Sequence, residues 1–290
     1  MRPRIGVAIL HGIGTQRRGF ADSFVASLAA ALGKREVPAE SFAFEQVHWA
    51  DVLAPAERLL LAESQRDGFL DWQPIRMFVI ETLADAVAYR RGYPVEWDAY
   101  HQIHWEVYRS LALLEERLSD PLAPLVVIAH SLGSVIISDH VWDEQKRQGF
   151  GRTSFTRCET LSGIITFGSN IPLFTLGLPE VRCIKFPAAT SPMPEATLAA
   201  ARWRNYYDRD DVLGYPLRTL SESFRATVDA DIEMTAGGPF TSWNPLSHNG
   251  YWSEHLFIDG VSEQLADLHL AHCGEGVELR TPAGVVQPSL

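Results

Sequence analysis

A serine lies between small residues in the stretch Ala129-His130-Ser131-Leu132-Gly133. The apolar run at 125–128 before it is typical of a short buried strand, and the apolar residues after it follow helical spacing. A serine at a tight turn from a strand into a helix has the form of a nucleophile elbow, which lifts the hydroxyl clear of the sheet. Ala129 stands where the usual pattern has glycine, and a methyl group is small enough for that position. Ser131 is therefore the predicted nucleophile.

A free serine hydroxyl is a weak nucleophile, so it needs a base, and the base needs a carboxylate to orient it. Candidates for both follow later predicted strands. The acidic turn Asp208-Arg209-Asp210-Asp211 comes after the strand predicted at 203–207, and His248 lies in the loop after the strand predicted at 227–234. Because functional groups gather at the carboxyl ends of parallel strands, we expect these groups to meet Ser131. The alternative bases, further along the chain, are His255, His269 and His272.

A glycine-rich turn, His11-Gly12-Ile13-Gly14, follows the first predicted strand at 5–10. Main-chain N–H groups in such a turn can stabilise the negative oxygen of a tetrahedral intermediate, each by about 3 kcal/mol. Gly12 and Gly14 also begin a dinucleotide-binding fingerprint, but Arg17 stands where the third glycine belongs. The pattern therefore disfavours a Rossmann dehydrogenase and leaves two interpretations, an oxyanion loop and a plain glycine-rich connection.

The elements that must position these groups alternate between strands and helices. Strands are predicted at 5–10, 42–49, 125–130, 161–167, 203–207 and 227–234, and the main helices at 19–33, 133–148 and 253–271. This alternation predicts a single α/β domain over residues 1–290, with a mostly parallel sheet covered by helices on both faces.

Residues 52–118 interrupt the alternation, because every apolar run within them has helical spacing. Gly68, Pro74, Gly92 and Pro94 separate the runs. The segment is predicted to be a helical insertion. Its apolar clusters suit a lid over a fatty-acyl pocket, or contact with a lipid surface, and the alternative is helices packed on a small core of their own.

Composition excludes several classes of protein. Of the 290 residues 46% are hydrophobic and 21% charged, as in ordinary globular proteins, and the net charge of −11 disfavours a nucleic-acid partner. Cys158, Cys183 and Cys273 have no CxxC spacing, so neither a zinc site nor a disulfide framework is indicated. The first apolar run is too short for a signal peptide, and no stretch approaches the roughly 18 apolar residues of a membrane span. We expect a cytoplasmic protein.

Taken together, these motifs resemble those of the α/β-hydrolase superfamily, in particular bacterial lipase- and esterase-like members with a His-Gly-Ile-Gly turn. Thr166-Phe167-Gly168-Ser169 is similar to the strand end of lipase-like members, and some small lipases also carry Ala-His-Ser-x-Gly. The likeness runs from about residue 5 to residue 271. It implies an α/β-hydrolase fold, with the 52–118 insertion as a helical cap before the nucleophile strand.

The resemblance also implies a role for individual residues. In lipase-like relatives the catalytic aspartate commonly lies two positions before a valine or isoleucine, which favours Asp210 and leaves Asp208 and Asp211 as alternatives. The family places its histidine where His248 lies. The main-chain amides of Ile13 and Leu132 would then be the oxyanion donors.

The implied activity is hydrolysis of a small carboxylic ester, with a lipid-like or medium-chain acyl group, through Ser131, His248 and Asp210. No metal or organic cofactor is required. Thioester hydrolysis and acyl transfer use the same three residues and are the alternative activities. A non-catalytic binding or scaffold protein is the alternative class, although a scaffold has no need to retain a serine, an acid and a histidine together.

Overall fold

The computed structural model of the chain describes residues 4–14, 16–55, 59, 88–89, 98–237 and 245–274, with the main chain alone for 245–247 and 249. Six strands form one sheet in which every neighbouring pair is parallel, in the order β2-β1-β3-β4-β5-β6. The predicted α/β class with a parallel sheet is confirmed. The strands are β1 (Ile5–Leu10), β2 (Phe42–Val47), β3 (Leu125–His130), β4 (Leu161–Phe167), β5 (Arg202–Tyr207) and β6 (Ala230–Glu233).

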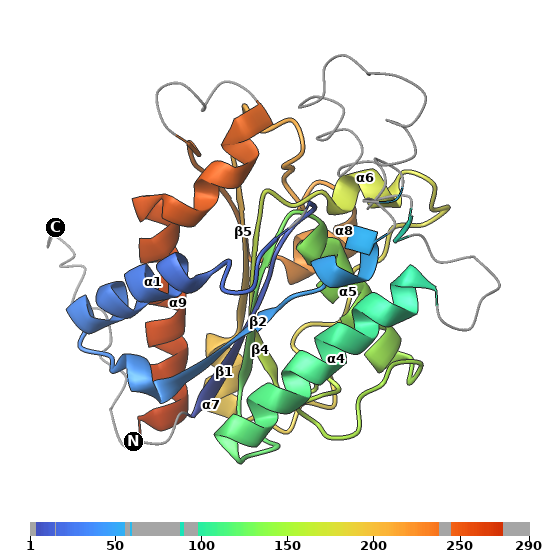
Figure 1. The fold of residues 1–290 in the computed structure, drawn as a ribbon. Helices are drawn as coiled ribbons and strands as arrows, with labels where there is room; N and C mark the ends of the chain where they lie inside the picture. The colour runs from blue at the N-terminus through green and yellow to red at the C-terminus, as the bar shows by residue number, and fades with distance from the viewer. Residues whose placement is uncertain are drawn as a thin grey trace, which may run out of the picture.

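Helices cover both faces of this sheet (Figure 1). On one face α1 (Asp22–Lys34) packs beside α9 (His255–Cys273), and on the other α4 (Ala99–Leu118) packs beside α5 (Leu132–Gln145). Shorter helices lie in the connections of the second half of the chain. They are α6 (Ile171–Thr175), α7 (Glu195–Ala200) and α8 (Glu222–Thr227). The 3₁₀ turn η1 (Ala39–Ser41) precedes β2, and the 3₁₀ turn η2 (Pro245–Ser253) precedes α9.

The two faces of the sheet explain why β1 and β3 read as unbroken apolar runs. Side chains alternate along a strand, so Ala8 and Leu10 join the core under α4 and α5, while Val7 and Ile9 join the core under α1 and α9. All six residues of β1 are buried. A strand buried on both faces needs apolar residues at every position, which is why its sequence shows no alternation.

Helix α4 is the described end of the segment predicted to be an insertion. Its buried stripe includes Ile103, Val107 and Leu111, and it packs on β1, β2 and α5. These residues therefore belong to the layer that covers the sheet and are not part of a cap. The rest of the predicted insertion lies outside the described residues, apart from 52–55, 59 and 88–89.

One difference from prediction lies before β6. A strand was expected over 227–234, but β6 begins only at Ala230, and Thr227 is the last residue of the unpredicted helix α8. The Ser221 hydroxyl accepts a hydrogen bond from the Phe224 N–H at 3.3 Å and so caps the first turn of α8. A capping serine of this kind supplies an acceptor for the first turn of a short helix.

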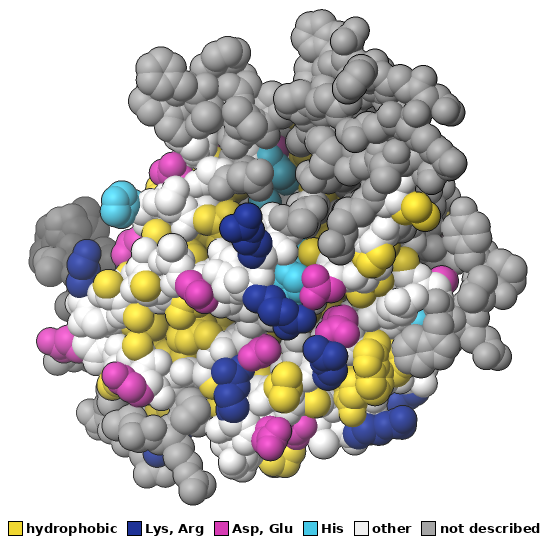
Figure 2. Space-filling model, in the orientation of Figure 1, with side chains coloured by type: hydrophobic (Ala, Val, Ile, Leu, Met, Phe, Trp, Pro, Cys, Tyr) yellow, Lys and Arg dark blue, Asp and Glu magenta, His cyan; other side chains and the backbone are white. Residues whose placement is uncertain are grey.

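Charges of both signs are interspersed among the described residues on the face shown in Figure 2. One exposed ion pair joins Arg35, just after α1, to Asp259 of α9 at 2.6 Å. Exposed pairs contribute at most about 1 kcal/mol each, so the apolar contacts beneath them hold the two helices together. In the described part of the chain no helix has both the length and the apolar character needed to cross a bilayer.

Candidate active site

The carboxyl ends of the parallel strands bring the predicted groups to one edge of the sheet. The turn His11–Gly14 follows β1, Ser131 follows β3, and the acidic turn follows β5. His248 lies on η2, in the connection between β6 and α9. Strand register alone therefore collects groups that are more than two hundred residues apart in the chain.

Ser131 occupies a strained turn between β3 and α5. Its φ is 51° and its ψ is −124°, a region that residues with a side chain rarely adopt. Two contacts hold the turn. The Ser131 N–H donates to the Phe167 carbonyl at 3.0 Å, and the Ser134 hydroxyl donates to the Ser131 carbonyl at 2.5 Å. The strand-to-helix turn predicted from the sequence is therefore present.

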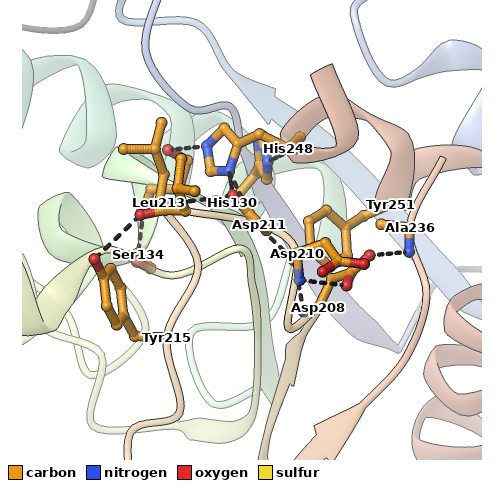
Figure 3. Close-up of polar contacts among 12 residues, drawn as sticks. His130, Ser134, Asp208, Asp210, Asp211, Leu213, Tyr215, Ala236, His248 and Tyr251 are labelled. Carbon is orange, nitrogen blue, oxygen red and sulfur yellow. Dashed lines mark hydrogen bonds and ion pairs between the residues drawn. The ribbon is translucent and has the colours of Figure 1, made fainter. Parts of the chain in front are cut away.

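Ser131, His248 and Asp211 form one chain of hydrogen bonds. Figure 3 labels His248 and Asp211 within it. The Ser131 hydroxyl lies 2.7 Å from His248 Nε2, and His248 Nδ1 lies 2.8 Å and 3.0 Å from the two Asp211 carboxylate oxygens. A carboxylate only accepts, so the His248 proton sits on Nδ1 and Nε2 is free to accept from the serine. All three side chains are buried. This is the geometry of a nucleophile, a base and an orienting acid.

The acid beside His248 is Asp211, which corrects the preference for Asp210. Asp210 is exposed, and its N–H donates to the Asp208 carboxylate at 2.9 Å. The residues after β5 make a tight turn, in which the Asp211 N–H donates to the Asp208 carbonyl at 3.3 Å. Asp211 lies one position further along this turn than Asp210, and its side chain points toward the sheet edge instead of toward solvent.

Asp208 has a structural role in the same turn. Besides accepting from Asp210, its carboxylate accepts from the Ala236 N–H at 2.5 Å, which joins the end of β5 to the segment after β6 (Figure 3). Its own N–H donates to the Tyr251 hydroxyl at 2.9 Å. Asp208 therefore binds main-chain amides, as aspartates in turns commonly do.

Two further donors surround the Asp211 carboxylate. The Tyr251 hydroxyl donates to it at 2.9 Å and the Leu213 N–H at 3.0 Å. Burial acts to raise the pKa of the Asp211 carboxyl, but the donors around it, His248 first, outweigh burial and hold that pKa below its ordinary value. Asp211 is therefore ionised beside the histidine. Tyr251 was not predicted, because a lone tyrosine after a loop carries no sequence signal of such a contact.

The His11–Gly14 turn lies directly against the nucleophile. A side-chain carbon on Gly12 would come within 2.7 Å of the Ser131 Cβ, and one on Gly133 within 2.5 Å of the His11 carbonyl oxygen. Only glycine allows these two segments to approach so closely. Leu132 is the first residue of α5, where main-chain N–H groups have no acceptor within the helix. Gly12, the residue before Ile13, is therefore in contact with Ser131, and Ser131 directly precedes the start of α5.

The His11 side chain fixes the Gly12 peptide. Its Nε2 accepts from the Trp49 N–H at 3.2 Å, so its proton is on Nδ1, which donates to the Gly12 carbonyl at 2.7 Å. Burial lowers the pKa of His11 to about 3, so the ring is neutral. Across the planar trans peptide the Ile13 N–H points away from the Gly12 carbonyl, and therefore away from His11.

The remaining histidines predicted as alternative bases lie on α9 away from Ser131. His255 is exposed, at the first position of the helix. The His272 ring contacts the Thr197 hydroxyl at 3.1 Å, and His269 packs near Phe42. The structure therefore brings His248, and not these three, to the serine.

The described residues contain no group of three or more His, Cys, Asp or Glu side chains that could hold a metal ion. Cys158 and Cys183 are buried, and burial raises the pKa of both thiols, to about 12 for Cys183. A thiol with a raised pKa is a poor nucleophile at neutral pH. Among the described residues, the serine, the histidine and the aspartate are the groups whose hydrogen bonds match a nucleophile, a base and an orienting acid.

Comparisons with known proteins add no relative to this description. No protein-family model matches the chain, and no curated protein sequence matches it.

Proposed function

We propose that the protein is a serine hydrolase of the α/β-hydrolase type that cleaves carboxylic esters. The observation that carries this proposal is the unbroken chain of hydrogen bonds from the Ser131 hydroxyl through His248 to Asp211. The parallel sheet, the strained turn at Ser131 and the chain order serine, aspartate, histidine all agree with it.

In the proposed reaction the Ser131 Oγ attacks the ester carbonyl carbon as His248 Nε2 takes the serine proton. The carbonyl electron pair moves onto oxygen, and the main-chain N–H groups of Ile13 and Leu132 stabilise that charge. Collapse of the intermediate breaks the bond to the alcohol, which receives the proton from His248. Water then attacks the acyl-serine by the same steps, and the carboxylic acid leaves.

Ionised Asp211 contributes to both steps through His248. It accepts the Nδ1 proton and so keeps Nε2 unprotonated before attack, and its charge stabilises the imidazolium that forms afterwards. Because the group is buried, this attraction is stronger than it is in water.

For the substrate we propose a small ester with a lipid-like or medium-chain acyl group. Support comes from exposed apolar side chains on the segments that follow β4 and β5, the strands that end at the site. Among them Leu176 is 82% exposed and Val212 61%. Val212 directly follows the acid, so an apolar substrate group bound at this edge would find apolar contacts.

A fluorophosphonate probe tests the proposal, because it forms a covalent bond only with an activated serine. We expect stoichiometric labelling of the wild type, together with hydrolysis of short nitrophenyl esters. In Ser131→Ala both should disappear, with a loss of rate of about 10⁴-fold or more. Ser162→Ala is the matched control, since Ser162 is equally buried but lies at the start of β4, at the opposite end of the strand from the site.

An unlabelled wild type without esterase activity would contradict the proposal. A chain-length series of nitrophenyl esters then tests the acyl preference, with an optimum at medium length expected. Parallel assays with thioesters, and with added alcohols as acceptors, separate hydrolysis of oxygen esters from the alternative activities.

A further inference from the structure

His130, the residue before the nucleophile, is enclosed at the centre of the site. It ends β3 and is 3% exposed. Its ring stacks on Phe167, with 4.8 Å between centroids, and lies 4.7 Å from the His248 ring. Figure 3 shows the two histidines side by side.

The His130 ring also makes a hydrogen bond to the main chain of the base. Its Nε2 lies 2.7 Å from the His248 carbonyl oxygen. A carbonyl only accepts, so Nε2 carries the proton and donates it. Burial holds the pKa of His130 well below its ordinary value, so the ring is neutral and its Nδ1 has no proton.

The hydrogen bond from His130 anchors the main chain of His248, whose ring is held by other residues. Ser131 and Asp211 contact the two nitrogens of the His248 ring, whereas His130 contacts the carbonyl group of the same residue. Ring and main chain of His248 are therefore held by different partners. A histidine fixed at both ends has little freedom to change its distance from the serine.

The anchor matters most after the first half of the proposed reaction. Once Ser131 is acylated, its Oγ has no proton and no longer donates to His248 Nε2. The ring then keeps Asp211 as its side-chain partner and must accept a proton from water instead. The His130 bond does not involve the serine and persists through this step.

We propose that His130 is a positioning residue that holds the main chain of His248 at the distance from Ser131 that both proton transfers require, a role that rests on the proposed hydrolase function. His130 touches no reacting atom in this role and acts through His248. The same ring also limits the oxyanion turn, since a side-chain carbon on Gly12 would lie 2.9 Å from His130 Nδ1.

A matched pair of variants isolates the hydrogen bond. The side-chain amide nitrogen of glutamine can occupy the position of histidine Nε2, whereas the shorter asparagine places its amide near the position of Nδ1. We expect His130→Gln to stay within about fivefold of the wild-type kcat, and His130→Asn to lose about 100-fold, as expected for a base displaced by roughly 1 Å. KM should change little in either variant. Rates are normalised to the serine titrated by fluorophosphonate, which removes any misfolded fraction.

A third variant separates the bond from ring packing. His130→Phe keeps a ring against Phe167 but has no donor, so its kcat should fall as far as that of His130→Asn. Wild-type kcat in His130→Phe would overturn the inference, and so would equal losses in the glutamine and asparagine variants. If the wild type itself neither reacts with the probe nor cleaves esters, the proposed function fails instead.

A measurement on the wild type needs no variant to fold. In protein with ¹⁵N-labelled histidine, the spectrum distinguishes rings protonated at Nε2 from rings protonated at Nδ1. We expect the His130 ring, assigned through its contact with Phe167, to be neutral with its proton on Nε2, and to keep that form when Ser131 carries the fluorophosphonate. A neutral His130 with its proton on Nδ1 would overturn the inference.

Discussion

Two regions of this molecule bury histidines beside acidic and hydroxyl side chains, at the start of α5 and along its contact with α4. At the start of α5, His248 lies between Ser131 and Asp211. Along the α4–α5 contact, the rings of His104 and His140 lie 5.4 Å apart, and both are buried. Burial is similar in the two regions, so burial alone does not distinguish a reactive histidine.

The difference is in what each ring nitrogen contacts. His248 has a carboxylate on Nδ1 and a serine hydroxyl on Nε2. In the other region His104 Nε2 contacts the Tyr89 hydroxyl at 2.9 Å, and His140 Nε2 has no hydrogen-bond partner among the described residues. Burial and then the nearby Asp139 charge raise the pKa of Tyr89, so its hydroxyl stays protonated. Of these two regions, the first has an ionised carboxylate, an imidazole and a serine hydroxyl joined in one line of hydrogen bonds.

The largest effect is expected when the Asp211 carboxylate is removed. Asp211→Asn keeps the shape of the side chain but can donate to His248 Nδ1 and so stabilise the wrong tautomer. We expect kcat for ester hydrolysis to fall by about 10⁴-fold. Asp210→Asn is the matched control one residue away, and it should keep the wild-type rate. A full loss in Asp210→Asn with an active Asp211→Asn would reverse the assignment.

A smaller loss is expected when the oxyanion turn is pushed away from the serine. Gly12→Ala puts a methyl group within 2.7 Å of the Ser131 Cβ, so the turn must shift. We expect kcat to fall by about 100-fold, the loss typical of one displaced oxyanion donor. Gly33→Ala is the control, because a methyl group there has no neighbour within 4 Å and lies in helix α1. Wild-type activity in Gly12→Ala would show that the His11–Gly14 turn does not take part in catalysis.

The smallest predicted effect is on the free energy of unfolding, through His140 at the α4–α5 contact. Burial lowers the pKa of His140 from 6.5 to about 4, so the unfolded chain binds a proton there at a pH where the folded chain does not. Stability must therefore fall as pH drops from 6.5 toward 4, by up to about 3 kcal/mol for this residue. The groups nearest to it are His104 and Glu144, whose Oε1 lies 4.0 Å from His140 Nε2.

His140→Leu removes that proton uptake and leaves the remaining titrating groups in place. Urea unfolding at pH 7.5 and pH 4.5 should show a free energy of unfolding that falls less steeply in the variant, by about 2 kcal/mol over this interval. Replacing the exposed His255 with leucine is the control and should leave the slope unchanged. Equal slopes for His140→Leu and the wild type would show that the two regions do not differ in this way.

Much of the fold was predictable from local pattern. The strand at 5–10 and the strand at 125–130 match β1 and β3 residue for residue, because strands buried on both faces have unbroken apolar sequences bounded by polar turns. The helix after Ser131 was placed within a few residues of α5. Helix α8 was missed, because six residues behind one capping serine are too short to show a helical period in the sequence.

For the site, the sequence by itself determined Ser131 and the order in which acid and base follow it, because small residues between a buried strand and a helix leave few other conformations. Only the tertiary structure decided which aspartate faces the base. Three carboxylates lie within four residues, and the direction of each depends on a turn closed by contacts with Tyr251 and Ala236. The same holds for His130, whose partner is a carbonyl group 118 residues further along the chain. Such contacts leave no local pattern, since they depend on how the strands are ordered in the sheet.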